Sequence, residues 1–407
     1  MAAPDGQGQP TRIAIACQGG GSHTAFTAGV LERLLRPDAL AGREVVGLSG
    51  TSGGAVCALL AWSALAAGDP GRAGRLLEDF WADNSATTFA EQWVNAWVGW
   101  VGELADYVAL PAVSPYDSPF SVAASDEFRH MLERRVDFAA IEADPGGRLP
   151  LLLVGAVDVR SGLFRTFDSR REAITADMIL ASAAIPTLFR SVPVDGQLYW
   201  DGLFSQNPPV KDLTDASPDE LWVVQINPGR REAEPRSVVE IADRRNELAG
   251  NLSLHQELRF IEKIDQLLAD GLLREGTYKQ IVVRLIELDR PLSSASKLDR
   301  DPAFIRGLIE LGRTKAEKFL ASLAFEDAWR RGDAEGVRAR VADGAAVDPS
   351  LLERLTEEVT VDLTRHQVAG DVVTWKVRGR GQDRGRKGRA EARFEDGQIT
   401  ELTLAPG

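Results

Sequence analysis

The fold is decided by the stretch Gly47-Leu48-Ser49-Gly50-Thr51-Ser52-Gly53-Gly54-Ala55, which lies at the end of a short apolar run. Residues 50–54 fit the pattern Gly-X-Ser-X-Gly, in which a serine sits on a sharp strand-to-helix turn with its hydroxyl above the sheet. This turn brings the first and last glycines of the pattern together, and a Cβ at either position would clash. Residues 55–65 are rich in alanine and leucine and predict a helix. Strand, turn and helix follow in order, so Ser52 is a candidate nucleophile.

A second glycine-rich loop lies about thirty residues before Ser52. Residues 12–17 predict a buried strand, residues 18–22 (Gln-Gly-Gly-Gly-Ser) a loop, and the apolar spacing over 26–35 a helix. Residues 44–49 predict the next strand. This order is a β-α-β unit with a right-handed crossover, whose two loops lie at the same edge of the sheet. If the strands are neighbours, their ends lie about 5 Å apart. The glycines then converge on Ser52.

This convergence suits an oxyanion hole. The backbone N–H groups of Gly19, Gly20 and Gly21 lead into a helix N-terminus, where the dipole favours negative charge. Beside a serine nucleophile, such donors are placed to hold the oxyanion of a tetrahedral intermediate. A dinucleotide-binding loop would need a glycine in place of Thr24, and a P-loop would need Gly-Lys-Ser/Thr. Neither is present, and a purely structural tight turn remains the alternative.

Two Asp-Gly pairs follow in the second half of this region. Asp195-Gly196 lies between the short β-type runs 192–194 and 198–200 and predicts a hairpin turn. Asp201-Gly202 comes after the second run, before the loop 203–209, where a carboxylate can point into a site. Spacing alone leaves open whether Asp201 is a catalytic group or a turn residue.

The choice of base depends on the histidines. A serine needs a proton acceptor, and histidine is the usual one. The chain has His23, His130, His255 and His366. The series Ser52, Asp201, His255 has the order of an α/β-hydrolase triad, but His255 lies within a helical pattern and is interpreted as a helix-surface residue. A Ser–Asp dyad remains, in which Asp201 works best in a desolvated site that raises its pKa from about 4.

Composition limits the class of protein. The 407 residues suggest two domains, and 44% apolar with 26% charged residues is typical of a soluble globular protein. A net charge of −13 argues against nucleic-acid binding. Cys17 and Cys57 form no disulfide framework, and residues 1–10 predict a disordered tip instead of a signal peptide. With no run of about eighteen apolar residues, we expect a cytoplasmic protein, in part peripheral at the membrane.

Residues 72–111 predict a helical insertion that is rich in tryptophan. Trp93, Trp97 and Trp100 form an apolar stripe at helical spacing. One interpretation is the packed core of a helical cap. The other is an interfacial lid that makes transient contact with a membrane surface, because tryptophan favours a place with one wet and one apolar end.

The rest of the chain divides near residue 320. Up to there, strands are expected at 149–157, 163–167, 221–226 and 281–288, and helices at 176–184, 238–273 and 302–322. Beyond it, two short helices (325–333 and 337–341) precede strands at 359–363, 372–377, 389–394 and 399–404. The basic stretch 376–393 is interpreted as a solvated hairpin.

The glycine loop 19–21, the serine motif 50–54 and Asp201-Gly202, taken in order, resemble the patatin-like phospholipases. The resemblance also covers Ala181-Ser182-Ala183-Ala184-Ile185-Pro186 and Tyr199-Trp200, and extends over residues 11–320. It implies a calcium-independent lipid acyl hydrolase on a three-layer α/β/α fold with a mainly parallel sheet, without metal or cofactor. It also implies the roles: Ser52 as nucleophile, Asp201 as base, and the Gly19, Gly20 and Gly21 backbone as oxyanion hole.

Two further expectations follow from resemblance. The family usually has Arg or Lys, then Gly, where this chain has His23-Thr24, so we expect His23 to contact the anionic substrate or intermediate. Residues 325–407 are similar to the SnoaL-like, nuclear-transport-factor-two-like fold, which implies a small α+β accessory domain. Dimerisation or ligand sensing is its expected role.

The sequence therefore predicts a serine hydrolase that cleaves lipid esters, phospholipids foremost, through an acyl-enzyme. Two alternatives keep the same dyad: an esterase or thioesterase, and a depolymerase of an intracellular storage polyester. An alternative of another class is a lipid-binding regulatory module with little turnover. The expected partners are a lipid ester and, through the C-terminal domain, a second copy of the chain.

Overall fold

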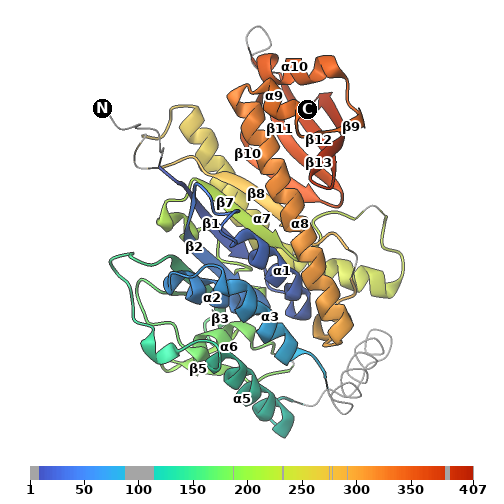
Figure 1. Ribbon diagram of the computed structural model, residues 1–407. Helices are drawn as coiled ribbons and strands as arrows, with labels where there is room; N and C mark the ends of the chain where they lie inside the picture. Colours follow the sequence, from blue (N-terminus) through green and yellow to red (C-terminus); the bar gives the residue numbers. More distant parts are fainter. Residues whose placement is uncertain are drawn as a thin grey trace.

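A computed structural model describes residues 9–87, 114–380 and 386–406, apart from the single positions 187, 232, 275, 277 and 291. In this part of the chain thirteen strands form one sheet, in the order β5-β6-β3-β2-β1-β7-β8-β10-β11-β12-β13-β9, with β4 paired to β3. Figure 1 shows the sheet running through the whole molecule.

The strands are β1 (Thr11–Cys17), β2 (Arg43–Thr51), β3 (Leu151–Asp158), β4 (Phe164–Asp168), β5 (Val192–Val194), β6 (Gln197–Asp201), β7 (Glu220–Gln225), β8 (Val282–Glu287), β9 (Val341–Ala346), β10 (Val359–Ala369), β11 (Val372–Gly379), β12 (Lys387–Glu395) and β13 (Gln398–Pro406). The described helices are α1 (Ala25–Leu34), α2 (Gly53–Ala66), α3 (Arg72–Asn84), α5 (Pro119–Glu133), α6 (Ala176–Ala183), α7 (Val238–Ala269), α8 (Pro302–Arg331), α9 (Ala334–Arg338) and α10 (Pro349–Glu358).

The central sheet is parallel, as predicted. The neighbours β3, β2, β1, β7 and β8 are joined by parallel pairings only. β1 and β2 lie side by side with Cys17 opposite Gly50, which confirms that the glycine loop and the serine turn meet at one edge. The Asp195-Gly196 turn lies where predicted, because β5 and β6 form an antiparallel hairpin around these two residues, both with positive φ.

Helices cover the two faces of this sheet, which makes three layers. Alternate residues of β1 enter different cores, because successive side chains of a strand point to opposite faces. Ile13 and Ile15 pack in the core formed with α1, α2 and α8, whereas Ala14 and Ala16 join the core that includes Leu254, Leu258 and Ile261 of α7. The predicted α/β/α fold class is confirmed.

The prediction of two short helices at 325–333 and 337–341 is wrong. α8 continues without a break to Arg331 and ends at Gly332, which has the left-handed φ of 69° that glycine favours. Its buried stripe, which includes Phe319, Leu323 and Trp329, runs across residues 320–325. The short helix α9 follows, then β9 and α10, two elements for which no prediction was made.

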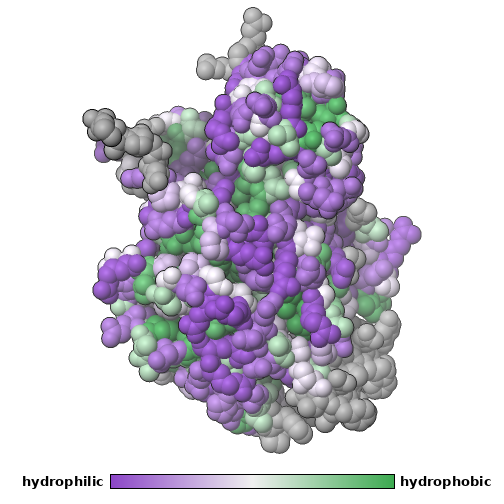
Figure 2. Space-filling model, in the orientation of Figure 1, coloured by the Kyte–Doolittle hydropathy of each residue, from purple (hydrophilic) through white to green (hydrophobic). Residues whose placement is uncertain are grey.

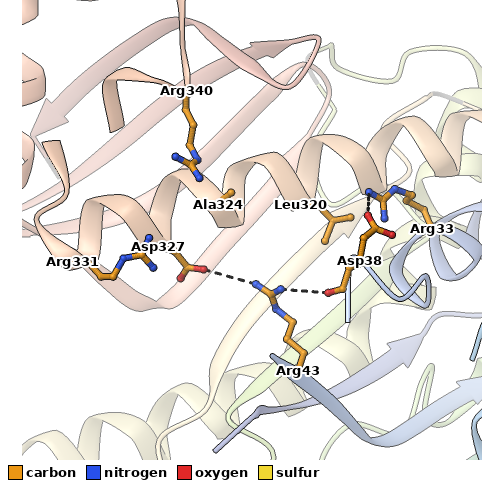
Figure 3. A pocket seen from close by; sticks show the side chains of 9 residues that line it. Arg33, Asp38, Arg43, Leu320, Ala324, Asp327, Arg331 and Arg340 are labelled. Carbon is orange, nitrogen blue, oxygen red and sulfur yellow. Dashed lines mark hydrogen bonds and ion pairs between the residues drawn. The ribbon is translucent and has the colours of Figure 1, made fainter. Parts of the chain in front are cut away.

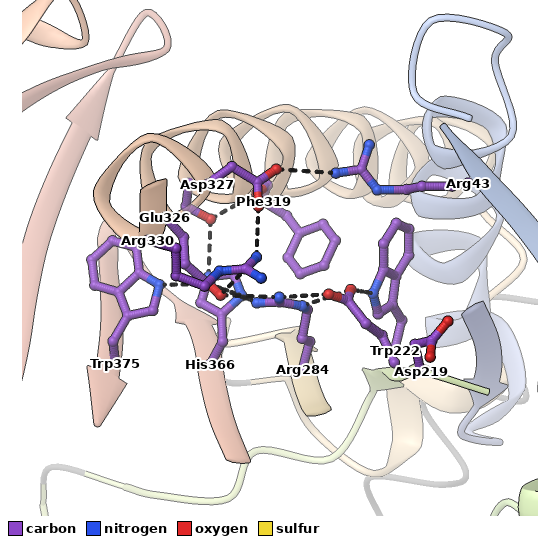
Figure 4. Close-up of polar contacts among 12 residues, drawn as sticks. Arg43, Asp219, Trp222, Arg284, Phe319, Glu326, Asp327, Arg330, His366 and Trp375 are labelled. Atoms are coloured by element: carbon purple, nitrogen blue, oxygen red, sulfur yellow. Dashed lines mark hydrogen bonds and ion pairs between the residues drawn. The ribbon is translucent and has the colours of Figure 1, made fainter. Parts of the chain in front are cut away.

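A buried polar cluster joins the C-terminal strands to the central sheet (Figure 4). Arg284 of β8 donates to both carboxylate oxygens of Glu220 on β7, at 2.8 and 2.7 Å, and to Glu326 of α8 at 2.6 Å. His366 of β10 lies 3.0 Å from Arg284 and stacks on Trp375 of β11. These contacts fix the parallel pairing of β10 with β8.

Hydrophilic side chains cover most of the face seen in Figure 2, with smaller apolar areas between them. Among the described helices, none is both long and apolar enough to cross a bilayer. Of the insertion expected at 72–111, α3 is described. The stripe Trp93, Trp97 and Trp100, and with it the expected membrane contact, lies outside the described residues.

Candidate active site

Ser52 occupies a strained turn between β2 and α2. Its φ of 57° and ψ of −132° place a non-glycine residue in a region that side chains avoid, as expected of a serine held at such a turn. A Cβ on Gly50 would collide with the carbonyl of Gly54, as predicted, whereas a Cβ on Gly54 would collide with the carbonyl of Cys17 at the end of β1. The Ser52 N–H donates to Ser182 Oγ at 2.9 Å, and this hydroxyl donates to the Gly155 carbonyl at 2.6 Å. α6 and β3 therefore hold the turn in place.

The glycine loop packs directly against this turn. A Cβ on Gly19 would lie 2.9 Å from the Cβ of Ser52, so only glycine allows the approach. The Gly19 N–H donates to Asn207 Oδ1 at 2.7 Å, however, and this corrects the expectation that it belongs to the oxyanion hole. Within the described residues, the N–H groups of Gly20 and Gly21 donate to no other group, which leaves them as the candidate donors.

Gln18 anchors the glycine loop to the end of β7 and to α7. Its Oε1 accepts from the N–H groups of Ile226 and Asn227, both at 2.8 Å, where the chain leaves β7. Its Nε2 donates to the Gly250 carbonyl and to Asn251 Oδ1 in α7. The buried amide thereby spans the end of the sheet, and the loop position is fixed by side-chain contacts on both sides.

Asp201 reaches the same edge from the other side of β3. Thr51 is paired with Gly155 and Asp201 with Ala156, so both candidate residues flank the end of one strand. Asp201 Oδ1 accepts from the Leu203 N–H at 2.8 Å. Its Oδ2 is buried and accepts no hydrogen bond within the described residues. A buried carboxylate oxygen without a partner is rare and is typical of a functional site.

The environment of Asp201 changes its acidity. Complete burial raises the pKa of Asp201 to about 7, although the Leu203 N–H, the Ser52 hydroxyl and Lys297 act in the opposite direction. The hydroxyl of Ser52 thus acts on the carboxyl group of Asp201, although Oδ2 makes no hydrogen bond within the described residues. Such contacts often tighten only when substrate binds. A carboxyl group with this pKa suits a general base near neutral pH.

His23 lies beside the glycine loop, but it is not a cation there. The ring is 3% exposed, its Nε2 lies 2.8 Å from Ser296 Oγ, and burial with the charge of Lys297 lowers the pKa of His23 to about 3. The ring is neutral at pH 7, which corrects the expectation of a titratable charge at this position. The cation comes instead from Lys297, whose backbone packs on Gly21 and whose Nζ donates to Asn227 Oδ1 at 3.0 Å.

The other three histidines stand away from Ser52. His130 in α5 and His255 in α7 are exposed on their helices. His366 belongs to the buried cluster around Arg284. The interpretation of His255 as a helix-surface residue is confirmed.

Four residues of the site were missed from the sequence: Gln18, Asn207, Asn227 and Lys297. Asn207 precedes two prolines in the loop after Asp201, a place where a buried amide that fixes a loop leaves no local pattern. Lys297 lies far along the chain from the glycine loop, in a short 3-10 helix (Ala295–Leu298). No spacing rule connects such distant positions.

Fold and site together define a hydrolase of the α/β class, with a serine on a strand-to-helix turn. Residues 15–214 match the family model described as patatin-like phospholipase. No curated protein matches the chain by sequence.

Among solved structures, VipD from Legionella pneumophila is 12% identical, with a TM-score of 0.39, and the match covers 77% of this chain and 67% of that chain. ExoU in the ExoU–SpcU complex from Pseudomonas aeruginosa is 15% identical, with a TM-score of 0.25. The match covers 81% of this chain and 67% of that chain. An NTF2-like protein from Cytophaga hutchinsonii is 11% identical, with a TM-score of 0.20. The match covers 22% of this chain and 89% of that chain. Likenesses this low carry no conclusion, and the fold assigned to residues 325–407 stays a prediction.

Proposed function

We propose that the protein is a lipid acyl hydrolase that uses Ser52 and Asp201 as a catalytic dyad. The observation that carries this proposal is the buried Oδ2 of Asp201, without a hydrogen-bond partner among the described residues, on the strand edge beside Ser52. The match of residues 15–214 to the patatin-like phospholipase family model supports a lipid ester as the substrate class. A small apolar cavity of about 60 Å³ lined by Leu180, Ala183 and Ala184 of the α6 segment adds apolar surface near Ser182.

The proposed reaction has two halves. Asp201 Oδ2 takes the hydroxyl proton of Ser52 while Oγ attacks the ester carbonyl, and the N–H groups of Gly20 and Gly21 hold the oxyanion. The tetrahedral intermediate collapses, and protonated Asp201 returns the proton to the leaving alcohol. Water then gives a proton to Asp201 as it attacks the acyl-enzyme. The fatty acid leaves, and Ser52 regains its proton.

A fluorophosphonate probe tests the nucleophile. We expect covalent labelling of the wild type and none of Ser52→Ala. Ser63→Ala is the matched control, because Ser63 lies in the same helix α2 and its Oγ bonds only the Leu60 carbonyl. If neither the wild type nor the control reacts, the protein is the lipid-binding module of little turnover that the sequence left open. Fatty acids released from phospholipid, triacylglycerol and thioester substrates would then separate the esterase alternatives.

Lys297 has a predicted effect on the pH dependence of the reaction. Only ionised Asp201 accepts a proton, so kcat/KM should rise with pH through the pKa of about 7. The nearby ammonium of Lys297 favours the ionised form of Asp201. Lys297→Met should therefore shift the rise of kcat/KM to higher pH and lower the maximal kcat/KM. Lys279→Met removes the same charge from an exposed pair with Asp219 and should leave the profile in place. A rise at the same pH in Lys297→Met would contradict the role.

A further inference from the structure

A cavity of about 280 Å³ lies between the first helix of the fold and the C-terminal part of the chain (Figure 3). Arginines and aspartates make up most of its wall, and Leu320 and Ala324 of α8 form its apolar floor. None of the proposed catalytic residues lines it. The full lining is Arg33, Asp38, Ala39, Arg43, Leu320, Ala324, Asp327, Arg331 and Arg340.

Both aspartates of the cavity already have an arginine at short distance, Arg33 of the cavity wall for Asp38 and Arg330 for Asp327. Asp38 accepts from Arg33 at 2.8 Å. Asp327 accepts from Arg330, which lies outside the cavity, at 2.6 Å, and its distance to Arg43 is 3.8 Å. The acidic side chains therefore leave much of the positive charge of the cavity uncompensated.

Three guanidinium groups remain with weak partners or none. Besides its contact of 3.8 Å with Asp327, Arg43 donates only one long hydrogen bond, of 3.3 Å, to the Ala39 carbonyl within the described residues. Arg340 donates to the Gly336 carbonyl at 2.6 Å, which carries no formal charge. Arg331 is exposed at the end of α8 and makes no hydrogen bond or ion pair within the described residues. Figure 3 shows Arg43, at the start of β2, and Arg340, in the turn before β9, both reaching toward the same stretch of α8.

We infer that this cavity binds a phosphate-bearing anion. Guanidinium forks match phosphate oxygens in charge and geometry, and three of them face this cavity in a chain whose net charge is −13. A water takes about 30 Å³ of liquid volume, so the cavity has room for a phosphate group with a small organic body. The ligand joins the start of β2 to α8 and to the segment between α9 and β9.

Calorimetry on the full-length protein tests the site with inorganic phosphate and glycerol 3-phosphate at low ionic strength. Arg331→Gln should weaken binding at least about tenfold, since charge-assisted hydrogen bonds are lost. Arg306→Gln is the matched control, because Arg306 is exposed on the same helix α8 and lies outside the cavity. It should bind like the wild type.

A vesicle arm separates a free phosphorylated molecule from a lipid headgroup. The Ser52→Ala protein, chosen to prevent hydrolysis, is sedimented with phosphatidylcholine vesicles with or without phosphatidic acid. Soluble phosphate binding that depends on Arg331 assigns a free ligand. Binding only to phosphatidic acid vesicles, lost in Arg331→Gln, assigns a headgroup. The inference is overturned if neither probe binds, or if Arg331→Gln and Arg306→Gln weaken binding equally.

Discussion

Asp201→Asn should make the protein inactive and, above about pH 7, more stable. The folded protein raises the pKa of Asp201 from its ordinary value of 3.8 to about 7. Folded Asp201 thus holds its proton more tightly than the unfolded chain does. This group therefore contributes a stability that is fully present below pH 4 and is lost as the pH rises to about 7.

The magnitude follows from the shift in pKa. Each unit corresponds to about 1.4 kcal/mol, so ionisation of buried Asp201 lowers the free energy of unfolding by about 4 kcal/mol above pH 7. Asparagine carries no such penalty. Its buried amide places an N–H₂ where Oδ2 has no partner, which costs about 1–3 kcal/mol. The expected net gain at pH 8 is therefore about 1–3 kcal/mol.

Urea unfolding between pH 4 and pH 8 measures this effect. The difference in unfolding free energy between Asp201→Asn and the wild type should grow by about 1.4 kcal/mol per pH unit up to about pH 7, then stay constant. The amide penalty is constant, so it does not affect the slope. Asp195→Asn, at the exposed hairpin turn, makes the same change in charge and is the matched control. Parallel profiles for Asp201→Asn and the wild type would refute the reasoning.

Two further substitutions test the fold by urea unfolding. Arg284→Met should lower the free energy of unfolding by about 3–5 kcal/mol, because Glu220 and Glu326 remain buried without their cation; adding Gln at both positions should recover most of the loss, and a loss that persists would show that packing is responsible. Gly21→Ala should cost about 1–3 kcal/mol from its φ of 56°, and more because the new Cβ collides with the backbone packed on it. Gly42 also has a positive φ, of 71°, but no atom lies close to where a Cβ would be. Gly42→Ala should therefore lower the free energy of unfolding only by the part that comes from φ.

Local patterns were enough to predict the turn around Ser52. The clash between Gly50 and Gly54 and the approach of Gly19 follow from steric rules that operate over a few residues or one β-α-β unit. The position of Asp201 at the end of a recognisable hairpin could also be predicted, but spacing alone left its role open.

The missed features depend on long-range packing. Lys297 takes over the charge expected at His23 only because the chain returns to the glycine loop after hundreds of residues. The Gly19 N–H is lost to Asn207 for the same kind of reason. The length of α8 was underestimated because the change of pattern near residue 325 suggested a new unit. The apolar stripe of α8 in fact continues to Trp329.

The pairing of β10 with β8 has a consequence for how the chain can be shortened. A chain that ended at Arg331 would keep every residue proposed for catalysis, but the outer edge of β8 would lose its neighbour. An open edge with alternating apolar residues such as Val283 and Leu285 is a template for pairing with another chain. The last strands should therefore keep β8 from pairing with another chain. Truncation before them should yield aggregates even where the catalytic half folds.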